Sequence, residues 1–288
     1  MTDYQAPSAE LRARVALEKH RFHNTHSLGQ NFLLSEGLLS SLLDEAGVGP
    51  EDNVLEIGPG AGVMTSLLAR RCARVLAIEV DRGLEPVLRD VLEGVDNVRL
   101  AFQDVMKADI AALTREAFDG GEYRVVANLP YYITADILLR LAGCETPPES
   151  ITIMVQKEAA ERIMSDPGNK QWCALAAELQ YYGAARVLAE VPPEAFDPPP
   201  HVTSCFIRID RHAEPIVRPR DERLFRRLIR AAFAMRRKTL ANNVKAAFGL
   251  DQEAACAVLD AAGVDRRVRG EALTLEQLCR VADAIGEK

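Results

Sequence analysis

The sequence predicts an α/β fold, a doubly wound parallel sheet followed by a small all-helical domain. Between residues 53 and 156, short apolar segments alternate with helical segments. The short segments are almost continuously branched and apolar, and only helical patterns follow residue 210. Strands that are apolar along their whole length are typical of a parallel sheet with helices on both faces.

The first predicted helix begins at Ser35, a favourable N-cap, continues through leucines at helical spacing and ends at Gly47. Strands are expected at residues 53–57, 74–80, 98–102, 124–127 and 151–156. Helices are expected between them at residues 62–71, 82–92 and 131–141. This alternation places the carboxyl ends of the strands at one edge, where α/β proteins bind ligands.

Four further helices are expected at residues 221–234, 236–248, 252–262 and 274–285. A proline-bearing stretch at residues 214–219 separates them from the last predicted strand. We therefore predict an N-terminal arm at residues 1–25, an α/β domain at residues 26–210 and a helical domain at residues 211–288.

Composition excludes several classes of protein. The chain has 288 residues, is 48% hydrophobic and carries a formal net charge of −7, which fits a globular protein with a core and not a disordered chain. No apolar window is long enough to span a membrane, and the N-terminus has no apolar signal region. The six cysteines form no CxxC pair, so we expect a reduced, cytoplasmic protein. His20, His23 and His26 lack fixed ligand partners, and no metal is expected.

A glycine-rich turn follows the first predicted strand. Val54–Ile57 run into Gly58-Pro59-Gly60-Ala61-Gly62. Glycines permit positive φ and let a ligand approach the backbone closely. A dinucleotide fingerprint would need its third glycine at position 63, where Val63 stands. The GxGxG spacing, with Glu56 before it, therefore favours S-adenosylmethionine over a dinucleotide.

Two carboxylates follow the next two strands. Glu79 ends the second strand and can accept hydrogen bonds from ribose hydroxyls. Asp104 follows the third and can accept one from the exocyclic amine of an adenine. Together with the glycine turn, they predict a site for one adenosyl ligand.

The fourth strand ends in Asn128-Leu129-Pro130-Tyr131, a pattern suited to methylating an exocyclic amino group. The lone pair of such a nitrogen is delocalised into the ring, so the nitrogen is a poor nucleophile. The Asn128 side-chain carbonyl and a backbone carbonyl at Leu129 or Pro130 can accept its two N–H bonds and localise the lone pair. Pro130 fixes the turn, and Tyr131 offers a face on which an extruded base can stack.

These motifs carry a family resemblance. LGQNFL at residues 28–33 precedes VLEIGPGAG, IEVD, QDV and NLPYY, and QKEAAER, FDPPPHVTS and FAMRRKTL follow in order. From about residue 26 to residue 285 the sequence resembles the ribosomal RNA adenine dimethyltransferases of the small-subunit type, the KsgA/Dim1 family. The family has Lys and Asp in many members where His201 and Thr203 stand here.

The resemblance implies a Rossmann-like class I methyltransferase domain that uses S-adenosylmethionine. It implies cofactor contacts from Gln30, Asn31, Leu33, Gly58, Gly60, Glu79, Asp104 and Asn128. It also implies a catalytic group of Asn128, Leu129, Pro130, Tyr131 and Phe196, in which Phe196 stacks on the target adenine opposite Tyr131. The implied product is N6,N6-dimethyladenosine at two adjacent adenosines in a hairpin loop near the 3′ end of 16S rRNA.

The charge is unevenly distributed. Residues 218–245 contain ten basic and two acidic residues, although the whole chain is acidic. Such a local stripe can neutralise RNA phosphates. We predict an RNA-binding face made of Arg223, Arg226, Arg227, Arg230, Arg236, Arg237 and Lys238.

The sequence thus predicts a monomeric rRNA adenine dimethyltransferase that acts on the small ribosomal subunit (the 30S particle) and contributes to its biogenesis. Three alternatives remain open. They are a large-subunit rRNA adenine methyltransferase of the macrolide-resistance type, a non-catalytic ribosome-assembly or transcription factor on the same scaffold, and a nicotinamide dehydrogenase. Leu129 disfavours the first, the intact Asn128, Pro130 and Tyr131 disfavour the second, and Val63 disfavours the third.

Overall fold

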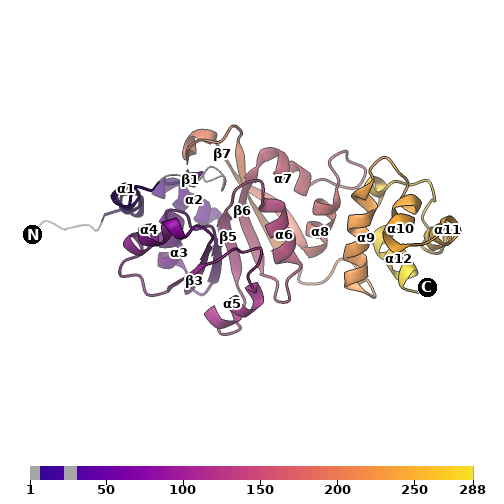
Figure 1. Cartoon of the computed structure of the whole chain (residues 1–288), viewed down its shortest axis with the longest axis horizontal. Coiled ribbons are helices and arrows are strands. Elements are labelled where there is room, and N and C mark those ends of the chain that lie inside the picture. Colours follow the sequence, from indigo (N-terminus) through magenta and orange to yellow (C-terminus); the bar gives the residue numbers. More distant parts are fainter. Residues whose placement is uncertain (1–6, 23–30, 288) are drawn as a thin grey trace, which may run out of the picture. The chain divides into compact units, whose positions relative to one another are not determined.

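The chain divides into two compact units in this computed structural model, which describes residues 7–22 and 31–287 (Figure 1). The first unit contains the described residues up to Ala160 together with Arg186–Asp210. The second contains Glu161–Ala185 and the described residues from Arg211 onward. Residues 161–185 therefore group with the C-terminal helices, whereas the sequence analysis placed them in the α/β domain.

The first unit is built on a seven-stranded sheet with the order β4-β3-β2-β5-β6-β9-β7. Its strands are β2 (Asn53–Ile57), β3 (Arg74–Glu79), β4 (Val98–Phe102), β5 (Arg124–Asn128), β6 (Ser150–Gln156), β7 (Gly183–Val191) and β9 (Ser204–Arg211). From β4 to β6 all neighbours are parallel, and β9 runs antiparallel to β6. The five predicted strands are present and adjacent, which confirms the α/β fold class.

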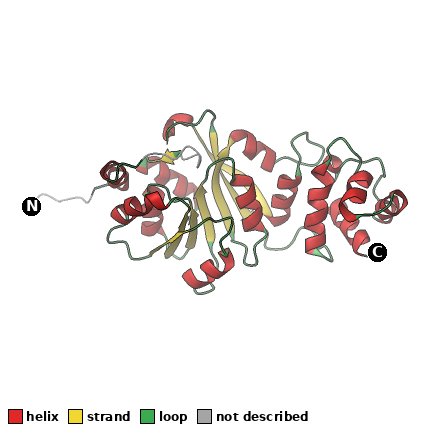
Figure 2. Ribbon diagram, in the orientation of Figure 1, coloured by secondary structure: helices red, strands yellow, loops and turns green. Residues whose placement is uncertain are grey.

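Helices accompany the strands of this unit, and Figure 2 shows the yellow strands side by side with red helices around them. They are α1 (Ala9–Lys19), α2 (Glu36–Ala46), α3 (Val63–Arg71), α4 (Glu85–Val91), α5 (Ile110–Ala117), α6 (Thr134–Ala142) and α7 (Lys157–Ile163). Helix α2 begins as predicted, because the Ser35 side chain accepts a hydrogen bond from the Leu38 N–H, and it ends at Gly47 with φ of 63°. Helix α5 was not predicted, and Asp109 caps it.

The central strands are buried on both faces, as their sequence predicts. Leu55 and Val125 are register partners in β2 and β5 and are fully buried, and the next positions on the opposite face, Val54 and Val126, are buried as well. A small second sheet pairs β1 (Phe32–Leu33) with β8 (Phe196–Asp197), so that Leu33 lies opposite Phe196. This pairing brings two segments together that are far apart in the sequence.

The second unit contains α8 (Ala174–Tyr182), α9 (Glu222–Ala234), α10 (Leu240–Phe248), α11 (Gln252–Ala261) and α12 (Leu275–Gly286). Its core includes Trp172, Phe225, Leu228 and Val258, all fully buried. Because Trp172 and α8 contribute to this core, residues 161–185 group with the C-terminal helices. Helix α10 begins four residues later than predicted, after Thr239, and leaves Arg236, Arg237 and Lys238 in the preceding turn.

No helix within the described ranges has the length and apolar character needed to cross a bilayer.

Candidate functional site

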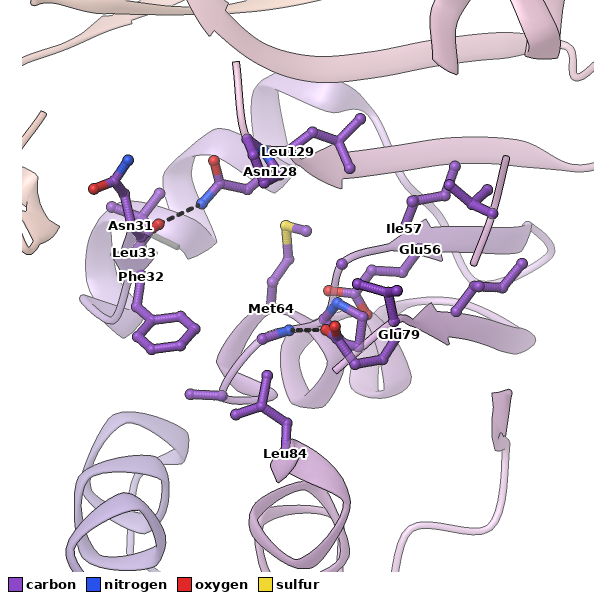
Figure 3. Close-up of a pocket in the computed structure, with 18 of the residues that line it drawn as sticks. Asn31, Phe32, Leu33, Glu56, Ile57, Met64, Glu79, Leu84, Asn128 and Leu129 are labelled. Atoms are coloured by element: carbon purple, nitrogen blue, oxygen red, sulfur yellow. Dashed lines mark hydrogen bonds between the residues drawn. The ribbon is translucent and has the colours of Figure 1, made fainter. Parts of the chain in front are cut away.

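The carboxyl ends of β2, β3 and β5 open onto a pocket of about 290 Å³ in the first unit (Figure 3). The residues from the predicted site that line it are Asn31, Leu33, Gly58, Gly60, Glu79, Asp104, Asn128, Leu129, Pro130 and Tyr131. Their elements are far apart in the sequence, and the parallel sheet brings their ends together. The pocket is therefore built where the sequence predicts a ligand site.

The glycine turn forms one wall of this pocket. Gly58, Gly60 and Gly62 have φ of 72°, 56° and 80°, which are values that side-chain-bearing residues rarely adopt. A Cβ atom at Gly60 would lie 3.0 Å from Cε1 of Phe32, so the Phe32 ring packs directly against the turn. Each glycine is thus required by the backbone conformation, and at Gly60 also by the space.

Glu79 lies at the end of β3 with its side chain directed at the glycine turn. Its carboxylate accepts hydrogen bonds from the Gly60 N–H at 3.2 Å and from the Asp81 N–H at 2.8 Å. Burial raises the pKa of Glu79, and these backbone donors oppose the shift. The carboxylate is held rigidly, with further lone pairs available for hydroxyl donors.

Glu56 lies beneath the same turn and lines the pocket. It is fully buried, and burial, with the charge of nearby Glu79, raises its pKa to about 8. Its place before the glycine turn is visible in the sequence, but Glu56 is not among the predicted site residues. A buried carboxyl in the pocket floor is a feature that only the fold reveals.

Four site residues lie at the carboxyl ends of β4, β3, β2 and β5, which are adjacent in that order: Asp104, Glu79, Gly58 and Asn128. Neighbouring strands lie about 4.8 Å apart, so the row extends over roughly 14 Å. One Asp104 carboxylate oxygen accepts from the Met106 N–H at 2.9 Å. This row suits an extended ligand with a base at one end and an amino-acid tail at the other.

The orientation of the Asn128 amide is fixed by a hydrogen bond. Its Nδ2 donates to the Asn31 backbone carbonyl at 3.3 Å, as Figure 3 shows. The two amide heteroatoms lie on opposite sides of the amide carbon, so Oδ1 is turned away from Asn31. Asn128 lines the pocket, and no described residue donates a hydrogen bond to Oδ1, so Oδ1 is the amide atom left to accept an N–H.

The structure distinguishes the two backbone carbonyls that the sequence left open. The Pro130 carbonyl already accepts hydrogen bonds from the Ile133 N–H at 3.2 Å and the Thr134 hydroxyl at 3.1 Å. Neither contact involves the Leu129 carbonyl. Leu129 is therefore the better second acceptor for an amino group.

Tyr131 is held at the pocket by a contact with another strand. Its hydroxyl lies 2.5 Å from Oγ of Ser204, a buried residue at the start of β9. Burial raises the pKa of Tyr131, so the phenol stays neutral at physiological pH. The Tyr131 ring lines the pocket in a fixed orientation.

Among the described residues, one predicted catalytic or cofactor-binding residue does not line the pocket. Gln30, also predicted, lies outside the described residues. Phe196 is 4% exposed, packs in the core of the first unit and is absent from the pocket lining. Phe196 lies opposite Leu33 in the β1–β8 pair, and Leu33 lines the pocket. Phe196 therefore supports a residue of the pocket wall without lining the pocket itself.

Other lining residues were missed because they carry no motif. Phe32, Met64 and Tyr132 reach the pocket from β1, α3 and the turn before α6. Phe32 stands beside the predicted Asn31 and Leu33, which was an available signal. Met64 is an apolar residue within a helical pattern and gave none.

The predicted basic face divides into two groups in the second unit. Arg230 pairs with the fully buried Glu178, and Arg226 lies 3.8 Å from the same carboxylate and over the Tyr181 ring. Arg226 is 16% exposed. These two arginines are therefore engaged in packing the unit.

The remaining five basic residues are all exposed, and two of them have partners. Arg227 lies over the Phe248 ring, and Arg236 donates to the Lys170 carbonyl at 2.6 Å. Within the described part of the chain, no residue forms an ion pair or hydrogen bond with the exposed side chains of Arg223, Arg237 or Lys238. Free, exposed cations are the ones that can neutralise phosphates.

Across the residues that the structure describes, no group of three or more His, Cys, Asp or Glu side chains is arranged to hold a metal ion.

The parallel sheet, the glycine turn and the carboxylates at adjacent strand ends define the chain as a class I S-adenosylmethionine-dependent methyltransferase. The family model described as ribosomal RNA adenine dimethylase matches residues 21–287. The chain belongs to this family.

Individual relatives agree with that membership. The chain is 42% identical over 275 residues to the ribosomal RNA small subunit methyltransferase A of Lachnoclostridium phytofermentans, covering 94% of this chain and 95% of the relative. Among solved structures it is similar to the 23S rRNA methyltransferase ErmE, with a TM-score of 0.64, 25% identity and coverage of 89% of this chain and 100% of the other. It also shares its fold with a dimethyladenosine transferase from Plasmodium falciparum, with a TM-score of 0.70, 22% identity and coverage of 86% and 94%.

Proposed function

We propose that this protein transfers methyl groups from S-adenosylmethionine to N6 of two adjacent adenosines near the 3′ end of 16S rRNA, in the small ribosomal subunit. The product would be N6,N6-dimethyladenosine, and the enzyme would act as a cytoplasmic monomer. The observation that carries the proposal is Asn128, whose amide is oriented by Asn31 in the pocket that also contains Glu79. The name of the 42% identical relative supports the small subunit as the substrate.

The pocket fits the cofactor. Glu79 would accept hydrogen bonds from the ribose hydroxyls, and Asp104 would accept one from the adenine amine. Gly58 and Gly60 line the pocket without side chains, so a ligand can approach the backbone there, and the Phe32 ring packs against the turn at Gly60. Asn31 and Leu33 line the wall beside Asn128. When bound, S-adenosylmethionine supplies an activated methyl group on a sulfonium centre.

The chain's own residues prepare the acceptor nitrogen. Asn128 Oδ1 and the Leu129 carbonyl accept the two N–H bonds of the adenine amino group. Each bond draws the nitrogen away from planarity, so that its lone pair is directed at the methyl donor. Pro130 holds the turn, with its carbonyl occupied by Thr134, and Tyr131 stacks on the base. Positioning for in-line transfer provides most of the catalytic effect.

Phe196 remains a predicted second stacking residue. Its ring is buried opposite Leu33, so in this conformation it supports the wall of the site. Stacking on the adenine would require the β8 segment to expose the ring when RNA binds.

RNA contact is proposed for the exposed basic residues of the second unit. Arg223, Arg237 and Lys238 are the main phosphate contacts, with Arg227 and Arg236 beside them in the sequence. Arg226 and Arg230 hold the unit together through Glu178. The function of the predicted face is therefore assigned to fewer residues than the sequence suggested.

The large-subunit alternative is not favoured. ErmE, a 23S rRNA methyltransferase, is 25% identical, whereas the small-subunit relative is 42% identical over nearly the whole chain. A non-catalytic assembly factor is disfavoured because Asn128, Pro130 and Tyr131 are intact and line the pocket.

The test is to incubate the protein with labelled S-adenosylmethionine and, separately, undermethylated small and large subunits, and to map the labelled base. We expect label in small subunits alone, as dimethyladenosine at two adjacent positions. Label in large subunits, or in neither, would contradict the proposal.

A further inference from the structure

Tyr132 is an exposed aromatic side chain at the mouth of the pocket. It is 64% exposed and lines the pocket. Among the exposed large hydrophobic side chains of the described residues, it is the one aromatic, and it is the most exposed. Because it lies beside a binding pocket, this ring offers a face on which a base of the ligand can stack.

The neighbouring Tyr131 has a different environment. Its hydroxyl is held by Ser204 and its ring is half-buried, so it belongs to the pocket itself. No described residue forms a hydrogen bond with the Tyr132 hydroxyl. The Tyr132 ring is therefore free to contact something larger than the cofactor.

The position of Tyr132 indicates which ligand it contacts. The other exposed apolar residue of the lining, Val80, follows Glu79, at the end of the pocket expected to hold the adenosyl group. Tyr132 follows Asn128, Pro130 and Tyr131, at the end expected to hold the methyl acceptor. The exposed ring thus lies on the RNA side of the pocket.

We propose that Tyr132 stacks on the RNA nucleotide next to the target adenosine. This inference rests on the proposed function, because it requires a base to be extruded into the pocket. Extrusion leaves the neighbouring base with one face unstacked. An aromatic ring can cover that face, and base–aromatic stacking tolerates any base because every base has a π-face. Since the two targets are adjacent, each adenosine in turn is the neighbour of the other.

The test compares Tyr132→Ala, Tyr132→Leu and Tyr132→Phe with the wild-type protein. The measurements are the KM for undermethylated small subunits in methyl transfer and, separately, the Kd for S-adenosylmethionine by calorimetry. We expect the KM to rise about tenfold in Tyr132→Ala and Tyr132→Leu and to stay within about twofold in Tyr132→Phe. The Kd for S-adenosylmethionine should stay within about twofold in all three, because the ring lies on the RNA side.

Val187→Ala is the matched control, since Val187 is 41% exposed but does not line the pocket. An unchanged KM in Tyr132→Ala, or Leu and Phe variants that behave alike, would overturn the stacking role while leaving the proposed function intact. Loss of cofactor affinity in Tyr132→Ala would place the ring at the cofactor and also overturn it. Wild-type protein that does not methylate small subunits would overturn both.

Discussion

Arg230, an exposed residue of α9, forms a two-pronged ion pair with Glu178, a buried residue of α8. The Arg230 Nε lies 2.8 Å from Oε1 of Glu178, and Nη2 lies 3.2 Å from Oε2. Glu178 is fully buried, and the pair raises the pKa of Arg230. An arginine that the sequence presents as one member of a basic stripe is therefore the partner of a buried carboxylate.

Removing Arg230 should destabilise the protein. Arg230→Ala leaves the buried Glu178 carboxylate with only the more distant Arg226, and a buried charge that loses a partner is costly. Because the Arg230 side chain is 62% exposed, solvent screens part of this cost, and we expect the free energy of unfolding to fall by roughly 1–3 kcal/mol. Urea denaturation measures it, with Arg223→Ala, at an exposed position of the same helix, as the control. Equal stability of the two variants would show that the pair has no structural role.

Removing the free cations should instead weaken RNA binding. The test is the triple variant Arg223→Gln, Arg237→Gln and Lys238→Gln. We expect the plot of the logarithm of the RNA association constant against the logarithm of the salt concentration to become less steep by about 2, since each phosphate contact contributes about 0.7 to the steepness. The thermal midpoint should not change, because these side chains have no partner among the described residues. Titration of small subunits at several salt concentrations provides the slope. A slope equal to that of the wild type would place the RNA on another face.

Glu79 should control cofactor affinity. Glu79→Gln keeps an acceptor for the Gly60 N–H but removes the charge that accepts ribose hydroxyls. We expect the Kd for S-adenosylmethionine to rise about 10- to 100-fold, in line with hydrogen bonds to charged groups. Calorimetry measures this, and Glu85→Gln, outside the pocket lining, is the control. Equal affinity of wild type and Glu79→Gln would remove Glu79 from the site.

Glu56 should make stability depend on pH. The pKa of its carboxyl is about 8 in the folded chain against 4.5 as the reference value. Between these pH values the unfolded chain has lost the proton that the folded chain keeps, so the stability contribution is full below about pH 4.5 and falls as pH rises toward 8. The slope is at most about 1.4 kcal/mol per pH unit.

The measurement for Glu56 is urea unfolding from pH 5 to 8, with Glu56→Gln as the comparison. We expect the variant to have a flatter profile and to gain stability over the wild type as pH rises. Parallel profiles would mean that Glu56 is ionised in the folded protein.

The sequence predicts the sheet and its ligand-binding edge well, because both depend on patterns within short segments of the chain. Strand ends such as Glu79 and Asn128 follow continuous apolar runs, and a parallel sheet must place those ends together. The glycine spacing also reports a backbone constraint, because Gly60 lies against Phe32.

Long-range contacts were beyond sequence reasoning. Nothing near Tyr131 indicates that Ser204, 73 residues away, holds its hydroxyl. Four arginines recur at helical spacing and therefore share one face of α9: Arg223, Arg226, Arg227 and Arg230. Only the packing of α8 shows that Glu178 lies beside Arg226 and Arg230. Charge patterns reveal which residues share a face, and the neighbouring element decides which of them remain free.

The most direct test of the central claim is single-turnover methyl transfer by Asn128→Ala to undermethylated small subunits. The variant keeps the pocket but removes the oxygen that accepts the adenine N–H. We predict that transfer falls by at least about 10²-fold, because the nitrogen loses its orientation, while the Kd for S-adenosylmethionine stays within a few-fold of the wild-type value. Transfer at the wild-type rate with Asn128→Ala would contradict the assignment of Asn128 as the residue that orients the acceptor nitrogen.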